Sequence, residues 1–401
     1  MPLAFPEAIG WAAHTPGGRG GRLLRVTTLK AMGEGSLAAA LAASGPRTIV
    51  FEVGGVIDLE RTTLEIREPF VTIAGQTAPS PGITLIKGGI TIRTHDVVMQ
   101  HLRVRPGEAG QAKLSGWEID GITTSNGAHD VIVDHCSTSW ATDENLSASG
   151  SRFSGDTPEE WREATSHRIT FSNNIVAEGL SNSTHRKGEH SKGSLIHDNA
   201  SDVLIASSLY HSNVERNPFF KGGARGVVAN NLISNPKAYA IKYTLVEQEW
   251  GDRPYQVGQL SVVGNVFVHG PATNPEAPLV YSSGAGPCQL FLSDNVAKAA
   301  DKQVPLLGGV LKNLLTVDKP PLWPDGFQPL AAAAVQAHVE KNAGARPWDR
   351  DATDLRIVRE ARSGGGKIID SEREVEGYPV SKETRSAFIP EAWDLASMTP
   401  R

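Results

Sequence analysis

Short runs of β-branched and apolar residues return along most of this chain, and this feature most limits how the chain can fold. From about residue 48 onward the runs include TIVFEVGGVIDL, HDVIVDHCSTSW, SDVLIASSLYHSN and CQLFLSDNVAKA. Each run is a few residues long and ends near Gly, Asn, Asp or Ser, which is typical of β-strands. The composition agrees, since 41 glycines, 25 prolines and only 6% aromatic residues favour short strands and tight turns.

One position within these runs repeats, and it defines the length of a unit. The residue before the second strand of each unit is, in order, Cys136, Asn174, Ser208, Asn231, Asn265 and Asn295. The intervals of 38, 34, 23, 34 and 30 residues lie in the range of solenoid proteins. Asparagine suits such a corner because its amide tolerates left-handed backbone and pairs with the units above and below.

This irregular spacing favours one architecture among the all-β folds. A sandwich or a propeller also contains many short strands, but a β-helix accommodates units of unequal length more easily because it places loops on one side. We therefore predict an all-β fold, a right-handed parallel β-helix (solenoid), within a single domain over residues 1–401. A solenoid lengthens along its axis, so a chain of 401 residues need not divide into several cores.

The two ends of the chain differ from the repeating part. Residues 1–47 form an N-terminal arm with a capping helix in GSLAAALAASG, for which Ser36 is the predicted N-cap. Residues 48–326 form the β-helix, and residues 327–401 form a helical and extended tail. In that tail Asp349 or Asp351 is the predicted N-cap, and Gly364 to Gly366 end the helix. We expect these helices to pack on the β-helix.

Bulk properties exclude several classes of function. The net charge of −5 does not indicate general binding of nucleic acid, and no apolar run approaches the 18 residues of a membrane span. Cys136 and Cys288 are predicted to be buried thiols. The opening residues lack the regions of a secretory signal, which predicts either a cytoplasmic chain or one whose signal has been removed. We expect a monomer.

Two acidic clusters lie about one coil apart. Glu118 and Asp120 are two residues apart on what reads as a strand, so both carboxylates would share one face. Asp143 and Glu144 follow in WATDENLS, with Asn145 and Ser147 nearby. Either cluster alone is more simply a solvated acidic turn, but oxygen ligands from adjacent coils are what Ca²⁺ requires.

Cationic residues follow on the next coils. HRKGEHSKGSLIHD contains His190 and Lys192, and NVERNPFFKGG contains Arg216 and Lys221. A charged surface loop is the simple interpretation of the first segment, and metal binding by its histidines is the less favoured one. Stacked coils would bring the carboxylates and cations side by side, and such a groove suits an acidic polymer.

Several motifs together resemble those of a known family. DVIVDHCSTSWATDENLS, HSKGSLI followed by RNP, and GARPWDRDATDLRIV resemble bacterial pectate lyases of polysaccharide lyase family 1. The resemblance covers most of the chain, including VTIAGQTAPSPGITL near its start. It implies a right-handed parallel β-helix that cleaves polygalacturonate by Ca²⁺-assisted β-elimination, outside the cell or in the periplasm.

The resemblance also implies residue roles. Asp120 and Asp143 match Ca²⁺ ligands, while Ser147 stands where the family has a further acidic ligand, so Glu144 or Asn145 would have to compensate. Glu118 completes the expected metal set.

On the cationic side, Lys192 matches a lysine that acts on the substrate, and Arg216 matches the arginine that takes the proton. Lys221 replaces a frequent arginine and would bind substrate together with His190. Lysine cannot bind a carboxylate in a bidentate manner, so Lys221 would hold the substrate less firmly.

The implied chemistry predicts how the rate of the reaction depends on pH. Arginine has a free pKa of about 12.5 or higher, so only nearby cations would make it a base, and we expect an alkaline optimum. The alternatives are a lyase for another uronate polymer, a polygalacturonase-like hydrolase that uses paired carboxylates, and a non-catalytic carbohydrate-binding β-helix.

Overall fold

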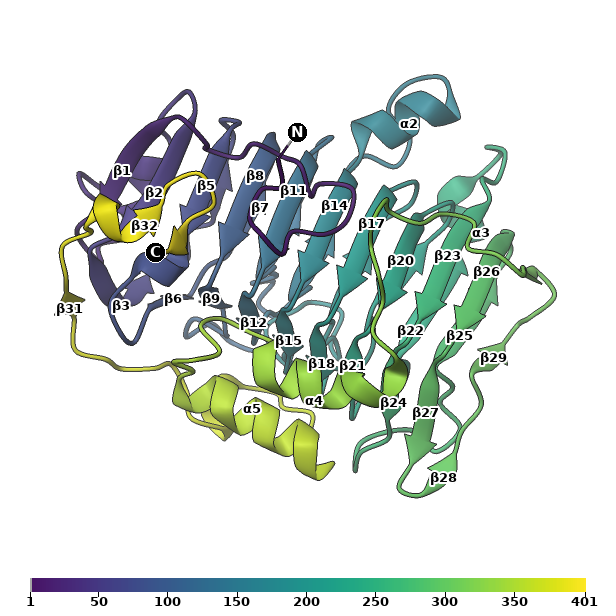
Figure 1. The fold of residues 1–401 in the computed structure, drawn as a ribbon. Helices are drawn as coiled ribbons and strands as arrows, with labels where there is room; N and C mark the ends of the chain where they lie inside the picture. The colour runs from purple at the N-terminus through teal and green to yellow at the C-terminus, as the bar shows by residue number, and fades with distance from the viewer. Residues whose placement is uncertain (1) are drawn as a thin grey trace.

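The computed structural model, which describes residues 2–401, is a right-handed parallel β-helix (Figure 1). Each coil contributes one strand to each of three sheets, which are named here sheets 1, 2 and 3 in the order in which the chain visits them. The strands of a sheet lie in chain order along the axis of the helix, except that β31 from the tail pairs with β3 at the start of sheet 2. The predicted fold class is therefore confirmed.

Sheet 1 contains eleven parallel strands. They are β1 (Arg22–Val26), β2 (Arg47–Phe51), β5 (Val71–Ala74), β8 (His95–Gln100), β11 (His129–Asp134), β14 (His167–Ser172), β17 (Ser201–Ala206), β20 (Arg225–Ala229), β23 (Gly258–Val263), β26 (Cys288–Ser293) and β30 (Leu314–Thr316).

Sheet 2 also has eleven strands, of which the two at its ends pair antiparallel. They are β3 (Val53–Asp58), β6 (Ile83–Ile86), β9 (Leu102–Arg105), β12 (Ser137–Ser139), β15 (Ile175–Ala177), β18 (Leu209–His211), β21 (Leu232–Ser234), β24 (Val266–Val268), β27 (Val296–Ala299), β28 (Lys302–Gln303) and β31 (Thr384–Arg385).

Sheet 3 has nine strands and forms the wall beside the candidate site. They are β4 (Leu64–Ile66), β7 (Ile90–Ile92), β10 (Ile122–Thr124), β13 (Leu146–Ala148), β16 (Leu195–Ile196), β19 (Phe219–Lys221), β22 (Ile241–Leu245), β25 (Val280–Gly284) and β29 (Leu307–Gly309).

The core consists of apolar side chains stacked in register along the axis. In sheet 1, Met99 lies opposite Val133, Val133 opposite Phe171, and Phe171 opposite Ile205, and all four are fully buried. Because side chains alternate between the two faces of a strand, every second residue of each coil points into this stack. The β-branched runs of the sequence supply those positions.

The repeating corner position forms the predicted ladder between sheets 1 and 2, but the left-handed backbone expected there belongs to the residue before it, such as Asn173 or Asn230. The backbone N–H of Cys136 donates to Oδ1 of Asn174 at 2.8 Å, and that of Asn174 donates to Oγ of Ser208 at 3.0 Å. The same bond continues from Ser208 to Asn231, on to Asn265, and then to Asn295. The side chains thus satisfy backbone groups that the turn leaves without a strand partner.

Helices cap and flank the coil. Helix α1 (Leu37–Leu41) begins after Ser36, whose hydroxyl accepts the N–H of Ala39, and it packs on the first coils. Helices α2 (Pro158–Ala164) and α3 (Glu247–Trp250) lie in loops that connect sheet 3 to sheet 1. None of the helices in residues 2–401 is long and apolar enough to cross a membrane.

The tail contains two further helices, which pack against sheet 2 (Figure 1). Helix α4 covers Ala332–Asn342 and helix α5 covers Ala352–Ser363. Asp351 is the N-cap of α5 and Gly364 ends it at φ 69°, as predicted, while Asp349 is not the cap. Short segments follow: η2 (Glu372–Glu374), η3 (Pro390–Ala392), β32 (Trp393–Asp394) and β33 (Thr399–Pro400), with η1 (Gly75–Thr77) earlier in the chain.

The start of the coil and the two cysteines can be compared with the predictions. Strand β1 lies within the stretch predicted as an arm, because Arg22–Val26 pairs in register with Arg47–Phe51 and so begins the coil earlier. Cys136 and Cys288 are free, buried thiols, as predicted. The division into arm, β-helix and tail as parts of one domain stays a prediction.

Candidate active site

The candidate residues meet along the corner between sheets 2 and 3, each just before a strand of sheet 3. Asp120 precedes β10, Glu144 precedes β13, Lys192 precedes β16, and Arg216 precedes β19. Parallel bridges place Glu144 beside Lys192 and Lys192 beside Glu215 on successive coils. The stacking of coils therefore gathers acidic and basic groups that are far apart in the sequence.

Three carboxylates form the acidic part of this site. Asp120, Asp143 and Glu144 each place one ligand atom within 4.8 Å of the others. Burial, and then the neighbouring charge of Asp143, raise the pKa of Asp120. Carboxylates crowded in this way are stabilised by a cation, and their oxygen donors fit Ca²⁺.

Glu118 does not join this cluster. Residues 117–120 form no strand, so the predicted strand at Glu118 and Asp120 is wrong. The N–H of Ile119 donates to the Thr142 hydroxyl, not to a neighbouring strand. Glu118 points to a different loop, where its Oε1 accepts the N–H of Arg186 at 3.1 Å.

Asn145 and Ser147, which follow Asp143 and Glu144 in the sequence, form hydrogen bonds away from the carboxylates. The Asn145 amide is fully buried, donates to the carbonyl of Ala177 and contacts Asn213. The Ser147 hydroxyl is buried and accepts the N–H of Leu195. Of the two residues considered as replacements for a missing acidic ligand, only Glu144 therefore lies with the carboxylates.

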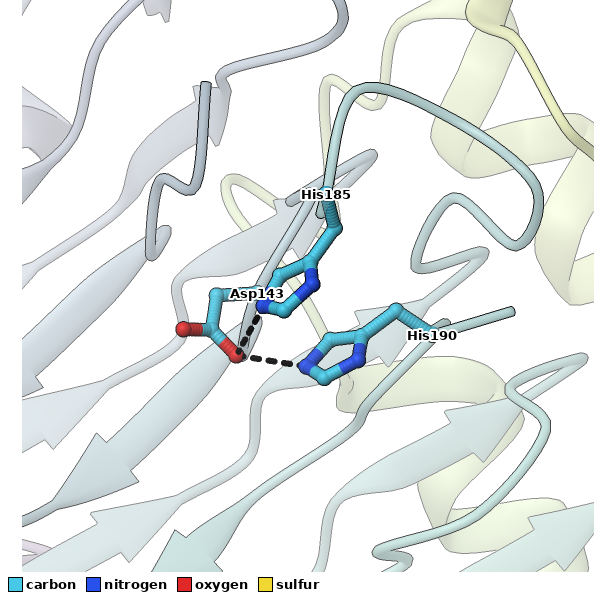
Figure 2. Close-up of side chains that lie close together, drawn as sticks. All are labelled: Asp143, His185 and His190. Atoms are coloured by element: carbon cyan, nitrogen blue, oxygen red, sulfur yellow. Dashed lines mark hydrogen bonds and ion pairs between the residues drawn. The ribbon is translucent and has the colours of Figure 1, made fainter. Parts of the chain in front are cut away.

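Two stacked histidines hold Asp143 (Figure 2). The rings of His185 and His190 lie 3.6 Å apart, and Nε2 of His190 is 2.7 Å from Oδ1 of Asp143. Burial acts against ionisation of Asp143, but the bond and charge of His190 outweigh it and lower the pKa of that carboxyl. His190 thus contacts the acidic cluster directly.

The same histidines are poorly arranged as metal ligands. Nδ1 of His185 accepts the backbone N–H of Lys187 at 3.1 Å, which places the ring proton of the neutral form on Nε2. Nε2 is also the nitrogen that faces Asp143, at 3.9 Å. Because a metal ligand needs an unprotonated nitrogen, the pair is better suited to orient Asp143.

Arg216 is the cation closest to the carboxylates. It adopts φ 67°, in the left-handed region, at the bend that leads into β19. Its guanidinium forms an ion pair with Glu144 and lies over the ring of Phe219. Burial lowers the pKa of Arg216, although Asp143 and Asp120 act in the opposite direction.

Lys192 lies one coil before Arg216 and is paired with an acid that sequence reasoning missed. Lys192 is 7% exposed, and its ammonium lies 2.7 Å from Glu215. Glu215 also contacts Lys242 at 3.4 Å. Lys242 is in register with Phe219 on one side and Tyr281 on the other, so it extends the row of cations along sheet 3. Only the register reveals Lys242, since nothing in the local sequence marks it.

Lys221 lies near the other cations, but its ammonium is already paired with two carboxylates. Its ammonium lies 3.3 Å from Asp198 and is also paired with Glu249. Arg152 forms ion pairs with the same two acids. Lys221 is therefore less available to a substrate than the sequence suggested.

Most of these groups line an open cavity of about 430 Å³, but Asp120 and Lys192 are not among its lining residues. Its walls include Asp143, Glu144, His190, Arg216, Lys221 and Lys242. Cations and carboxylates both line it, which is what the binding of an acidic polymer with bridging cations would require.

Comparisons with known proteins bear on the family and the fold of the chain. No protein-family model matches the chain. A probable pectate lyase C of Emericella nidulans is 36% identical over 279 residues, covering 69% of this chain and 55% of the relative, so that match spans about half of the relative's length. Proteins of the same description from Aspergillus terreus and Neosartorya fischeri are 30% and 31% identical over 389 and 393 residues. These two matches each cover 94% of this chain and 81% of the relative.

Solved structures show the same fold. The major allergen of cedar pollen has a TM-score of 0.60 at 17% identity, covering 84% of this chain and 92% of that one. A variant of Bacillus subtilis pectate lyase has a TM-score of 0.57 at 14% identity, covering 84% and 96%. At these identities the likeness concerns the β-helix alone.

Fold and relatives together define the class, which is a polysaccharide lyase built on a parallel β-helix. More narrowly, the chain belongs to the pectate lyase family. The three relatives described above are fungal, whereas the sequence motifs suggested bacterial members.

Proposed function

We propose that this enzyme cleaves polygalacturonate by β-elimination in the groove along sheet 3, with Arg216 as the base. The observation that carries the proposal is the convergence of Arg216 with Asp120, Asp143 and Glu144 on one corner, in a member of the pectate lyase family. Such a polymer lies outside the cytoplasm, and we propose that the enzyme acts there.

The reaction removes the proton on C5 of a uronate and breaks the bond from C4 to the glycosidic oxygen. Arg216 in its neutral form takes the C5 proton, the electron pair becomes the C4–C5 double bond, and the leaving oxygen is protonated by solvent. To reach C5, the guanidinium must leave its pair with Glu144. Lys192 and Lys242, which share Glu215, supply positive charge for uronate carboxylates along the groove.

We propose Ca²⁺ as the cofactor. Asp120, Asp143 and Glu144 would hold it, with His190 orienting Asp143. When bound, the ion would stabilise the charge that develops on the substrate carboxylate. Glu118 is left out of this set because it contacts the loop at Arg186.

The test is the ultraviolet absorbance of the 4,5-unsaturated product on polygalacturonate, with added Ca²⁺ and again with a chelator. We expect a rise that the chelator abolishes and a rate that increases toward alkaline pH, since the base must lose its proton. New reducing ends without absorbance would instead identify a hydrolase. Absence of both signals on polygalacturonate would point to another uronate polymer or to a binding protein.

A further inference from the structure

A second cavity, of about 610 Å³, lies at the other corner of the coil, between sheets 1 and 2. Three distant segments form its walls with the ends of β5, β8 and β11: residues 5–7, the turn at Trp348, and residues 393–400. Both chain ends cross the outer face of sheet 1 (Figure 1). The cavity shares no lining residue with the groove.

An exposed aromatic ring, packed against two neighbouring side chains, stands at this cavity. Trp348 is 62% exposed, the most exposed tryptophan among residues 2–401. Its ring packs edge-on against His101 at 4.9 Å, and the guanidinium of Arg346 lies 5.5 Å from its centre. A lone exposed aromatic residue is common, but one held at a cavity offers a ready surface for the apolar face of a sugar ring.

His101 offers a hydrogen-bond donor at the cavity wall, and Gln76 carries an acceptor that a rotation of its side chain would expose. Oε1 of Gln76 is buried without a partner among residues 2–401, while its Nε2 donates to Gln100 and to the carbonyl of Met398. Nδ1 of His101 accepts the N–H of Arg346, so the ring proton lies on Nε2. A hydroxyl group both donates and accepts, which matches such a pair.

The charges of the lining residues decide which sugar fits. Within residues 2–401, no lysine or arginine lines the cavity, whereas Glu7 does. The Asp134 carboxylate is already bound by Gln100, Ser172, Asn173 and His135. The carboxylate of a uronate would therefore be repelled by Glu7, with no free cation to offset that charge. An uncharged sugar would not be repelled.

We propose that this cavity binds an uncharged pyranose unit of a neutral glycan, at a site separate from the lyase groove. Trp348 stacks on the sugar ring, and Gln76 and His101 bond to its hydroxyls. Two sites on one molecule would hold the enzyme on material that contains both neutral and acidic polysaccharide, by raising the effective concentration of the groove there.

The first experiment is calorimetric titration of the full chain with cellohexaose and, separately, β-1,4-galactohexaose. We expect one of them to bind with a Kd of roughly 1 mM or tighter, and Trp348→Ala to weaken that binding at least roughly tenfold. Gln76→Leu should also weaken it. Leu355→Ala removes an apolar side chain of similar exposure on α5 and should change nothing. Binding of neither sugar, or equal binding by Trp348→Ala, would overturn the proposal.

A second experiment separates this site from the groove. Saturating trigalacturonate, added with Ca²⁺ to the Arg216→Ala variant so that it is bound but not cleaved, should leave binding of the neutral sugar unchanged. Trp348→Ala should also keep the wild-type rate on polygalacturonate. Competition by trigalacturonate would place the sugar in the groove and contradict the proposal. Because the titration does not depend on lyase activity, its result stands whatever the elimination assay shows.

Discussion

Arg216 is held in the groove by its neighbours, and this arrangement bears directly on its proposed role. Its ion pair with Glu144 and its contact with the ring of Phe219 place it at the acidic cluster, while burial lowers its pKa. Arg216→Ala should reduce the elimination rate on polygalacturonate by about 10²–10⁴-fold, the usual contribution of a positioned base.

The matched control for Arg216 is Lys187→Ala, which removes an exposed cation from the same groove. We expect it to change the rate little. Co-sedimentation with insoluble pectate, together with the thermal midpoint, would separate lost chemistry from lost binding or folding. If Arg216→Ala kept more than about a tenth of the rate, another group would be the base.

His101 should link stability to pH. Burial, followed by the charge of His135, lowers the pKa of His101 to about 3. The unfolded chain, in which a histidine titrates near its ordinary value of about 6.5, therefore binds more protons than the native state between these two values. Stability should fall as the pH is lowered from about 6.5 toward 3.

Urea unfolding of His101→Gln at several pH values checks this expectation. Gln keeps an acceptor for the N–H of Arg346 but cannot take up a proton. Its stability should depend less steeply on pH than that of the wild type. Equal slopes in the two proteins would show that His101 does not contribute.

At the scale of elements, the corner ladder joins successive coils through buried amides. Asn231 accepts the N–H of Ser208, and it donates to the carbonyl of Ile205 and to Asn265, all at 3.0 Å. Asn231→Ala would leave these groups buried without partners. The free energy of unfolding should fall by about 2–4 kcal/mol, as measured by chemical denaturation. Asn274→Ala, at an exposed turn, should stay within about 0.5 kcal/mol of the wild type; equal effects of the two changes would contradict a structural ladder.

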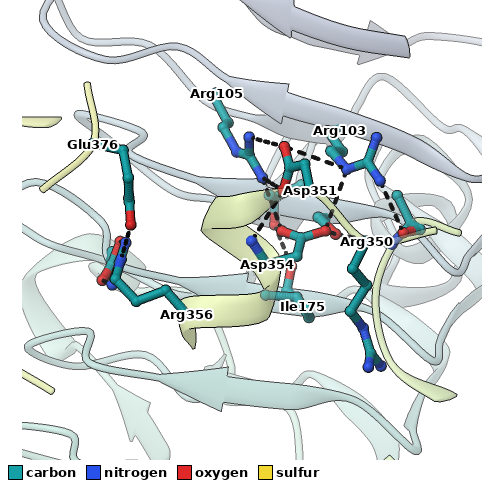
Figure 3. Close-up of polar contacts among 12 residues, drawn as sticks. Arg103, Arg105, Ile175, Arg350, Asp351, Asp354, Arg356 and Glu376 are labelled. Carbon is teal, nitrogen blue, oxygen red and sulfur yellow. Dashed lines mark hydrogen bonds and ion pairs between the residues drawn. The ribbon is translucent and has the colours of Figure 1, made fainter. Parts of the chain in front are cut away.

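Helix α5 is fastened to sheet 2 by a buried ionic network (Figure 3). Arg105 donates to Asp354 at 2.9 Å and to Asp351 at 2.6 Å, and the side chains of Arg103 and Arg105 are fully buried. Ser137 also donates to Asp354, at 2.6 Å. The network therefore joins β9 and β12 to the first turn of the helix.

Removal of one partner should be costly because it leaves buried guanidinium charge uncompensated. Asp354→Ala should lower the free energy of unfolding by about 3–5 kcal/mol, as measured by chemical denaturation. Arg359→Ala, an exposed change on the same helix, is the control and should have little effect. If both variants unfolded alike, the network would not be what holds α5.

At the scale of the whole molecule, the open ends of the β-helix govern association. Helix α1 packs over the first coils. At the other end the edge strands β28, β29 and β30 have only two or three residues each, and β28 turns back antiparallel. Short edges of this kind resist pairing with another chain.

We therefore expect a monomer. Light scattering after size exclusion should give a mass near 42.8 kDa across a range of concentrations. Exposed Leu311 and Leu315 lie near that final edge. A concentration-dependent mass that Leu311→Lys abolished would show instead that the end of the coil is an interface.

Much of the architecture could be predicted from the sequence, for local reasons. The corner residues from Cys136 to Asn295 recur once per coil because each coil must satisfy the same backbone groups. Ser36, Asp351 and Gly364 end helices through the chemistry of their own side chains or backbone. The motifs around Asp143, Lys192 and Arg216 led correctly to the family.

The site itself was only partly predictable, because its partners come from other coils. The strand expected at Glu118 is absent, since the chain there bonds to a side chain of the next coil. Lys221 is taken up by Asp198 and Glu249, which belong to loops of unrelated sequence.

By itself, then, the sequence determined the coil, its corner ladder, its helix ends and the family, since each depends on residues close in the chain or on a repeated spacing. Only the tertiary structure decided that Glu144 meets Arg216, that Lys242 extends the row of cations, and that three distant segments enclose a cavity beside Trp348. The physical reason is that strand register and loop length determine which side chains of neighbouring coils meet. Neither of them can be predicted from one segment of the sequence alone.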